Sequence, residues 1–224
     1  ILLLCSPHNP VCRVWSEEEL TAVLDIARRH RLVVVSDEIH CDLTFTDKPR
    51  HTMLAKLAGP EDALVTAVAP SKSFNMPGLG LSALVIPDAD RRKAMKDVFE
   101  SMHLPQCNPF SIAGFEAGYR HGAPWLDDLM AYLQASRDYV VEAVGQRLPA
   151  IRVSAPEGTY LMWLDCRELG LDDAGLKRFF VREAGVGMNP GLSFGDPGSG
   201  FMRLNIGCAR SVLEEVIGRI EAAL

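Results

Sequence analysis

One lysine stands in a short run of small residues, Ala69-Pro70-Ser71-Lys72-Ser73-Phe74-Asn75, directly after an apolar segment. An amine at the end of a buried strand would face a cleft rather than bulk water. Such an amine can lose its proton and attack an aldehyde. Taken alone, the segment fits an ordinary surface lysine flanked by serines better, because short motifs often occur by chance.

An acidic residue follows a second apolar segment, Val33-Val34-Val35-Ser36-Asp37-Glu38-Ile39-His40. A carboxylate at the end of a buried strand could keep a pyridine nitrogen protonated, so that the ring accepts electrons from a substrate carbanion. The alternative is a loop acid that caps the next turn. Glu38 would point to the opposite side of an extended chain, so the pattern favours Asp37 for this role.

Two further polar residues stand out, Asn9 in Pro7-His8-Asn9-Pro10 and Arg203 in the apolar segment Phe201–Ile206. Asn9 offers an amide donor in a rigid turn, although Asn-Pro is also a common turn signal without further function. A half-buried guanidinium needs an anion, and its planar fork matches a carboxylate with two parallel hydrogen bonds. An Asp or Glu of the protein itself is the alternative partner for Arg203.

The elements that would position these residues follow an α/β pattern. Short apolar runs at 1–4, 32–35, 63–68 and 81–86 predict strands buried on both faces, in a mostly parallel sheet with helices on both sides. Ser16 to Glu19 fits a capping box, which predicts a helix ending near Arg31. Ligands of open α/β sheets bind beyond the carboxyl ends of the strands, which is where the polar residues fall.

The rest of the chain predicts a different arrangement. Residues 90–148 are mainly helical in pattern, with breaks at Leu104-Pro105 and near Gly122. A strand at 159–165, a helix at 173–184, a strand at 201–206 and a last helix opened by a capping box, Ser211 to Glu214, predict a small α+β domain. We therefore expect a large domain at 1–105, linking helices at 106–148 and a small domain at 149–224.

Composition excludes several classes of function. The formal net charge of −6 and the pI near 5.5 argue against a nucleic-acid partner. The apolar opening at 1–4 ends at Ser6-Pro7, so it fits neither a signal peptide nor a membrane span, and predicts that the chain is a piece of a larger protein. The six cysteines lack the spacing of a metal site or a disulfide framework, which predicts reduced thiols in a cytoplasmic protein.

Together these segments resemble the fold type I pyridoxal-phosphate (PLP) enzymes, the class I/II aminotransferase superfamily. The order Asn-Pro, Asp, Lys, Arg along the chain is the order of that family. Within that superfamily, the motifs Ser36-Asp37-Glu38-Ile39-His40 and Ser71-Lys72-Ser73-Phe74-Asn75 are most similar to those of the cystathionine β-lyase-like branch, which consists of carbon–sulfur lyases. Gly158-Thr159-Tyr160-Leu161 with Trp163, and Asn189-Pro190-Gly191 with Phe194-Gly195, are also similar to that branch.

The resemblance implies a role for each residue. Lys72 would bond covalently to PLP and shuttle the Cα proton, and Asp37 would pair with the pyridine nitrogen. Asn9 and His40 would contact the phenolic oxygen of the cofactor, and Ser71 its phosphate. Arg203 would bind the α-carboxylate of the substrate. The resemblance also implies a homodimer and no metal.

Three departures from the family's pattern stand out. Cys12 occupies a turn position that usually carries glycine, so the turn must adopt another conformation or some strain. Gly80 stands where many aminotransferases have a phosphate-binding arginine, as is common in the lyase branch. The chain resembles the carboxyl-terminal portion of these enzymes, which implies that the glycine-rich phosphate cup and the aromatic residue stacked on the pyridine ring lie outside it.

The expected activity is cleavage of cystathionine or another cysteine S-conjugate to pyruvate, ammonia and a thiol. An aminotransferase on the same scaffold is the alternative, because the same residues serve both reactions. An alternative from another class is an inactive fragment or binding domain that has kept the cofactor residues as relics.

Overall fold

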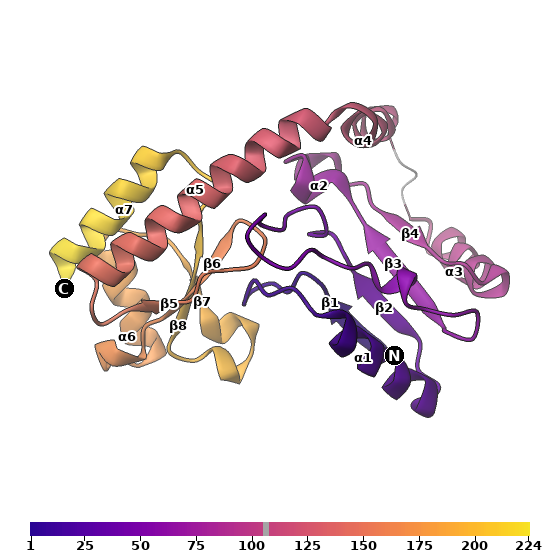
Figure 1. Cartoon of the computed structure of the whole chain (residues 1–224), viewed down its shortest axis with the longest axis horizontal. Coiled ribbons are helices and arrows are strands. Elements are labelled where there is room, and N and C mark those ends of the chain that lie inside the picture. Colours follow the sequence, from indigo (N-terminus) through magenta and orange to yellow (C-terminus); the bar gives the residue numbers. More distant parts are fainter. Residues whose placement is uncertain (105–107) are drawn as a thin grey trace. The chain divides into compact units, whose positions relative to one another are not determined.

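The computed structural model describes residues 1–104 and 108–224. The chain forms two compact units (Figure 1). The first unit comprises Ile1–His8 and Val14–Asp128, and the second comprises Asn9–Arg13 and Leu129–Leu224. The short segment Asn9–Arg13, next to the first strand in the chain, thus packs with the carboxyl-terminal residues.

The first unit is built on a sheet of four strands in the order β1-β2-β3-β4. These strands are β1 (Leu2–Cys5), β2 (Val34–Asp37), β3 (Leu64–Val68) and β4 (Ala83–Val85). β1, β2 and β3 are parallel, and β4 runs antiparallel to β3. The carboxyl ends of β1, β2 and β3 therefore meet at one edge of the sheet, as the sequence predicts.

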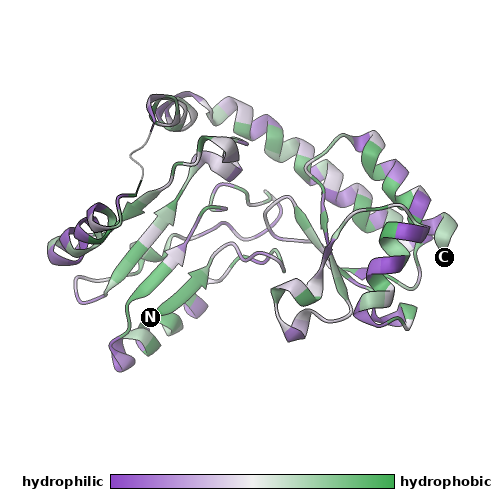
Figure 2. Ribbon diagram, turned by 180° about the vertical axis from the view of Figure 1, so that it is seen from behind, coloured by the Kyte–Doolittle hydropathy of each residue, from purple (hydrophilic) through white to green (hydrophobic). Residues whose placement is uncertain are grey.

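Helix α1 (Glu17–His30) covers one face of this sheet. The predicted capping box is confirmed: Glu19 N–H donates to Ser16 Oγ, and Ser16 N–H donates to the Glu19 carboxylate. The buried face of α1 packs on strand residues in a core of Leu4, Leu20, Leu24, Ala27, Val34, Leu54 and Leu64. The strands of the sheet are mostly hydrophobic in Figure 2, and Leu3, which points to the opposite face, is 79% exposed.

Short and long helices follow the strands. The first unit has the turns η1 (Leu54–Lys56) and η2 (Pro77–Leu79), the one-turn helix α2 (Pro70–Ser73), α3 (Ala89–Ser101) and α4 (Pro109–His121). The predicted break near Gly122 is confirmed, because α4 ends at His121, α5 (Ala123–Arg147) begins at Ala123, and Gly122 alone separates them. The predicted break at Leu104-Pro105 lies partly outside the described residues. α5 crosses from the first unit into the second, and the division into domains at 105 and 148 stays a prediction.

The second unit is built on an antiparallel sheet in the order β5-β6-β8-β7. Its strands are β5 (Arg152–Val153), β6 (Leu161–Asp165), β7 (Asn189–Pro190) and β8 (Phe201–Asn205). Helix α6 (Asp173–Arg178) continues into a π-helical turn, η4 (Phe179–Glu183), and the chain ends with α7 (Arg210–Ala223). The remaining turns are η3 (Arg167–Leu169), η5 (Gly191–Phe194) and η6 (Asp196–Gly198).

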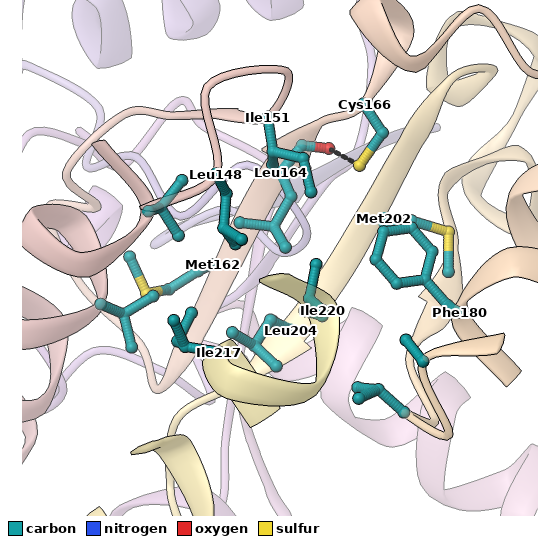
Figure 3. Close-up of a cluster of buried hydrophobic side chains, with 14 of the residues drawn as sticks. Leu148, Ile151, Met162, Leu164, Cys166, Phe180, Met202, Leu204, Ile217 and Ile220 are labelled. Atoms are coloured by element: carbon teal, nitrogen blue, oxygen red, sulfur yellow. Dashed lines mark hydrogen bonds between the residues drawn. The ribbon is translucent and has the colours of Figure 1, made fainter. Parts of the chain in front are cut away.

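The core of the second unit lies between one face of this sheet and the helices (Figure 3). Alternate residues of β6 and β8 enter this core, namely Met162, Leu164, Met202 and Leu204. Ile217 and Ile220 of α7 pack against them. The residues between them in sequence, Trp163 and Arg203, are cross-strand partners on the other face of the sheet. An α/β unit and a small α+β unit agree with the predicted fold class.

The predicted capping box at Ser211 to Glu214 is wrong. α7 begins at Arg210 and its N-cap is Ala209, which has no side chain that could cap the helix. Ser211 is therefore the second residue of the helix, where its hydroxyl is not placed to act as an N-cap. The Ser-x-x-Glu spacing is present near the start of this helix, but the two residues do not form a capping box.

Three further features concern membrane spans, metal-binding groups and cysteines. Within the described residues, no helix is both long enough and apolar enough to cross a membrane. The same residues contain no group of three or more His, Cys, Asp or Glu side chains arranged to hold a metal ion. Five cysteines are described and all are free, namely Cys5, Cys12, Cys41, Cys166 and Cys208; Cys107 lies outside the described residues.

Candidate active site

Four of the predicted site residues lie in the first unit, after the ends of β2 and β3. Asp37 is the last residue of β2 and pairs with Cys5 of β1 and Ala67 of β3. His40 follows three residues later. Ser71 and Lys72 belong to α2, which begins two residues after β3 ends. The parallel register therefore places both loops at the same edge of the sheet.

Asp37 is partly buried and lines a pocket of about 390 Å³ on the face of the sheet opposite α1. The pocket is mainly apolar and is also lined by Leu3, Leu4, Cys5, Val35, Ile39, Ala67 and Ser82. Asp37 Oδ1 accepts a hydrogen bond of 3.2 Å from Ile39 N–H, which fixes the carboxylate at the end of the strand. Lys72, His40 and Ser71 do not line this pocket.

Glu38 points away from Asp37, as strand alternation predicts. Its carboxylate is fully buried and accepts hydrogen bonds from Ser36 Oγ at 2.9 Å and from Leu54 N–H at 3.1 Å. His51 Nε2 lies 2.7 Å from Glu38 Oε2. Glu38 is thus committed to a buried structural network, and Asp37 is the acid of this strand that faces the pocket.

Lys72 lies in a helix of a single turn. Pro70 occupies the first position of α2, where its missing N–H costs nothing. Lys72 is partly buried, and its amine has no hydrogen bond or ion pair with any residue that the structure describes. The two residues that follow it are well anchored: Ser73 is fully buried and Phe74 packs on α4. The amine is therefore available for chemistry on a backbone that is anchored directly after it.

His40 and Ser71 flank these residues. His40 is buried, with 3% of its surface exposed, and its carbonyl accepts a hydrogen bond from Leu43 N–H in a turn. Ser71 is partly buried, and its carbonyl accepts from Met76 N–H as the chain leaves α2. Their predicted contacts with a cofactor stay predictions.

Asn9 and Arg203 lie in the second unit and contact each other. Arg203 Nη1 donates to Asn9 Oδ1 at 2.8 Å, and Nη2 donates to Asn189 Oδ1 at 2.9 Å. The guanidinium carbon lies 4.7 Å from the centre of the Phe194 ring. Arg203 Nε is buried without a hydrogen-bond partner. The bond between Asn9 and Arg203 joins residues that are 194 positions apart in sequence.

The charge of Arg203 has no acidic partner among the described residues. Its two hydrogen-bond acceptors are neutral amides and its third neighbour is an aromatic ring. A partly buried guanidinium without an anion is costly, so the arrangement is that of a receptor for an anion from outside the described residues. The alternative partner, a protein Asp or Glu, is not found there.

The hydrogen bond from Arg203 also fixes the orientation of the Asn9 amide. Because Asn9 Oδ1 accepts from a group that can only donate, its Nδ2 is the end left to donate. This orientation is the one that a donor to a phenolic oxygen requires.

Cys12 stands at the turn position where glycine was expected, and it adopts a left-handed conformation with φ of 61°. Burial raises the pKa of its thiol to about 11, and a hydrogen bond with Thr159 and the charge of Arg203 oppose that shift. The Cys12 thiol donates to Pro10 C=O at 3.0 Å. The turn therefore keeps the conformation that glycine favours, with a buried thiol in place of a hydrogen atom.

Three further residues contact the predicted site residues or their neighbours, and no role was predicted for any of them from the sequence. Asn189 holds Arg203 from β7, where the two residues are cross-strand partners. His51 pairs with Glu38, and Asp42 accepts a hydrogen bond from Ser73. Asn189 belongs to a segment already similar to the lyase branch, whereas His51 and Asp42 lie in an irregular loop with no periodic signal.

Comparisons with known proteins identify the family of the chain. Residues 1–220 match the family model described as aminotransferase class I and II. Cystathionine beta-lyase PatB of Bacillus subtilis is 39% identical over 225 residues, which cover 100% of this chain and 58% of PatB. The crystal structure of cystalysin from Treponema denticola, which contains a pyridoxal 5'-phosphate cofactor, superposes with a TM-score of 0.96 at 33% identity. That match covers 99% of this chain and 56% of cystalysin.

An aminotransferase has a similar structure as well. The aromatic aminotransferase of Pyrococcus horikoshii superposes with a TM-score of 0.88 at 25% identity, over 99% of this chain and 58% of that protein. The chain thus spans little more than half the length of the relatives that it matches. The comparisons do not confirm the expectation that it is their carboxyl-terminal portion. Because the family model matches nearly every residue, the chain belongs to the aminotransferase class I and II family.

Proposed function

We propose that the protein containing this chain is a PLP-dependent carbon–sulfur β-lyase that cleaves cystathionine or a related cysteine S-conjugate to pyruvate, ammonia and a thiol. Its membership of the family and the PLP found in solved relatives support the choice of cofactor. Relatives named cystathionine beta-lyase, at 33% to 39% identity, support the choice of reaction.

The described residues suit PLP. Lys72 offers an amine without a protein partner, and Asp37 offers a carboxylate at the mouth of an apolar pocket. Asn9 offers an amide donor whose orientation is set by Arg203. His40 and Ser71 follow the same strand ends. An amine, a carboxylate and neutral donors are the groups that an aldehyde, a pyridine nitrogen and a phenolic oxygen require.

When bound, PLP supplies an aromatic ring that accepts negative charge from the Cα of an amino acid. Lys72 would hold the cofactor and then take the proton from Cα as a general base. Asp37 would keep a proton on the ring nitrogen, which strengthens the ring as an electron acceptor. The thiolate is a far better leaving group than hydride or carbon, so a substrate with sulfur on Cβ favours elimination.

The observation that carries the amino-acid substrate is the uncompensated guanidinium of Arg203. With neutral amides at both Nη atoms and a buried, unpartnered Nε, it is suited to an α-carboxylate. Phe194, which lies against the guanidinium, limits the directions from which a carboxylate can approach. This arrangement serves a lyase and an aminotransferase equally well.

The aminotransferase remains the second candidate because proteins of that name match the same residues. Two curated aminotransferases have lower identities, 26% for YugH of Bacillus subtilis and 28% for aspartate aminotransferase of Musicola paradisiaca, against 39% for PatB. A solved structure described as a putative aminotransferase from Clostridium difficile matches PatB in identity, at 39%. One assay separates the two reactions. The full-length enzyme with PLP is given cystathionine without any keto acid, and pyruvate is followed by its enzymatic reduction.

Pyruvate release that depends on Lys72 is the expected result, with Lys72→Ala as the control. Absence of pyruvate from every cysteine S-conjugate, together with rapid exchange between an ordinary amino acid and 2-oxoglutarate, would overturn the lyase assignment and leave the cofactor assignment standing. Inactivity in both assays with PLP bound would favour a binding protein.

We also propose a homodimer and a cytoplasmic location. Large apolar side chains on α4 support an interface, since Phe110 is 80% exposed and Ile112 is 52% exposed. The native mass of the full-length protein, measured by light scattering, tests the dimer. The five free cysteines support a reducing compartment.

A further inference from the structure

We propose that Asp42 is a positioning residue for Lys72 and acts through Ser73. This inference rests on the proposed function, in which Lys72 holds the cofactor and moves a proton. Neither Asp42 nor Ser73 belongs to the residues predicted to contact the cofactor or the substrate.

A hydrogen bond links the two loops of the first unit that contain predicted cofactor residues. Ser73 Oγ donates to Asp42 Oδ2 at 2.7 Å, and Ser73 is fully buried. Asp42 follows His40 by two residues in the loop after β2, and Ser73 follows Lys72 directly. The bond therefore fixes the loop of His40 against the turn of Lys72, across 31 positions of sequence.

Among the described residues, Asp42 has two side-chain hydrogen-bond neighbours, Ser73 and the thiol of Cys41. Its partly buried carboxylate forms no ion pair there. Burial, and secondarily the charge of Asp42, raise the pKa values of the Cys41 thiol and the Tyr119 phenol to about 12. Its neighbours are thus uncharged near neutral pH. Because a partly buried carboxylate is costly without hydrogen bonds, the bond from Ser73 stabilises the loop as well as α2.

The residue after Ser73 is anchored from the other side. The Phe74 ring packs edge to face on Tyr119 at 5.5 Å and lies 6.2 Å from Trp125. Gly118 of α4 and Gly122, the C-cap of that helix, leave room for this ring, and a Cβ at Gly118 would lie 2.9 Å from it. Phe74 thus holds α2 against α4 while Ser73 holds it against the loop of Asp42.

Lys72 depends on these anchors because α2 is too short to hold its own shape. A helix of one turn has almost no intrinsic stability in water. The orientation of the Lys72 side chain is therefore set by the contacts of Ser73 and Phe74. A displacement of about 1 Å in a reacting group can cost on the order of a hundredfold in rate.

The experiment uses the full-length enzyme, stripped of PLP and then reloaded. The rate at which Lys72 captures PLP is measured by borohydride fixation at timed intervals and peptide mass analysis. Ser73→Ala and Asp42→Ala should each slow this capture and lower kcat by about tenfold or more, while the KM for the amino acid changes little. Asp42→Asn should restore most of the rate, because its amide oxygen still accepts the bond. Asp47→Ala, at an exposed acid of the same loop, is the matched control.

Each outcome decides the proposal. The double variant should be no slower than the slower single variant, since both remove one bond. Capture rates within about twofold of the parent in Ser73→Ala and Asp42→Ala, or strictly additive losses, would overturn the positioning role. If Asp42→Ala does not fold, Ser73→Ala and Asp42→Asn decide the question. If the parent enzyme fixes PLP on another lysine, the proposed function fails and this inference with it.

Discussion

Glu38 Oε2 and His51 Nε2 lie 2.7 Å apart, with 0% and 4% of their side chains exposed. Ser36 Oγ and Leu54 N–H donate to the other carboxylate oxygen, and His51 Nδ1 lies 3.4 Å from the hydroxyl of Ser6. This network ties the ends of β1 and β2 to the loop that ends at η1. It lies on the opposite side of β2 from Asp37, so it supports the strand end without entering the pocket.

The first prediction concerns the stability of this network. His51→Ala leaves Glu38 Oε2 buried without this partner, while Oε1 keeps its two donors, so we expect a loss of about 1 to 3 kcal/mol in the free energy of unfolding. Urea unfolding of both proteins measures the difference. Lys93→Ala, which breaks an exposed pair with Asp97 on α3, is the control and should change the value by less than about 1 kcal/mol. Equal effects of the two substitutions would argue against a stabilising contact between His51 and Glu38.

The sequence predicts the direction of the Glu38 side chain in this network but not its partner, His51. Strand alternation requires Glu38 to point away from Asp37, and the structure confirms it. Nothing in the sequence identifies His51 as the partner, because it lies 13 residues later in an irregular segment whose path depends on packing around η1. The direction of a side chain in a strand is a local property, whereas its partner is set by tertiary structure.

The second prediction concerns Arg203. Lysine places a point charge where the guanidinium offers two parallel donors, so Arg203→Lys should weaken amino-acid binding by about 1.5 to 3 kcal/mol. The PLP content of the enzyme should stay nearly unchanged. Binding can be followed by the change in the visible absorption of the cofactor on titration with an amino acid. The corresponding amino-acid amide, which has no carboxylate, should bind both proteins alike; unchanged affinity for the acid would make Arg203 a structural residue.

The contact between Asn9 and Arg203 could not be predicted from the sequence. Each residue can be selected on its own, Asn9 from a turn and Arg203 as the single charge in an apolar strand. The hydrogen bond between them depends on the segment Asn9–Arg13 packing with the second unit rather than with the strand it follows. No local periodicity encodes that choice, and the order of motifs along the chain predicts a shared site without predicting its contacts.

The third prediction concerns alkaline pH and Cys12. Burial raises the pKa of this thiol from 9.0 to about 11, so the folded state disfavours the thiolate. The stability due to the neutral thiol is complete below pH 9 and is lost as the pH rises toward 11. Between pH 8 and pH 10, the parent should lose about 1 kcal/mol more than Cys12→Ala. Cys208→Ala, at a less buried thiol, is the control; identical losses in parent and Cys12→Ala would mean that Cys12 does not titrate as a buried group.

The last prediction concerns the start of α7, where the expected capping box is absent. The N-cap is Ala209, an exposed residue with extended backbone angles (φ −61°, ψ 144°) and no side chain to accept from the free N–H groups of the first turn. Ala209→Ser supplies that acceptor in a backbone already suited to it, so we expect a gain of about 1 kcal/mol in the free energy of unfolding.

Ser211→Ala separates this interpretation from the sequence prediction. If Ser211 capped the helix, its removal would cost about 0.5 to 2 kcal/mol. Because Ser211 is the second residue of the helix, where alanine has the higher helix propensity, we expect no loss beyond about 0.5 kcal/mol. Thermal and urea unfolding of the parent and the two variants measure both values. A large loss in Ser211→Ala together with no gain in Ala209→Ser would place the start of the helix two residues later, at the position that the Ser-x-x-Glu spacing predicts.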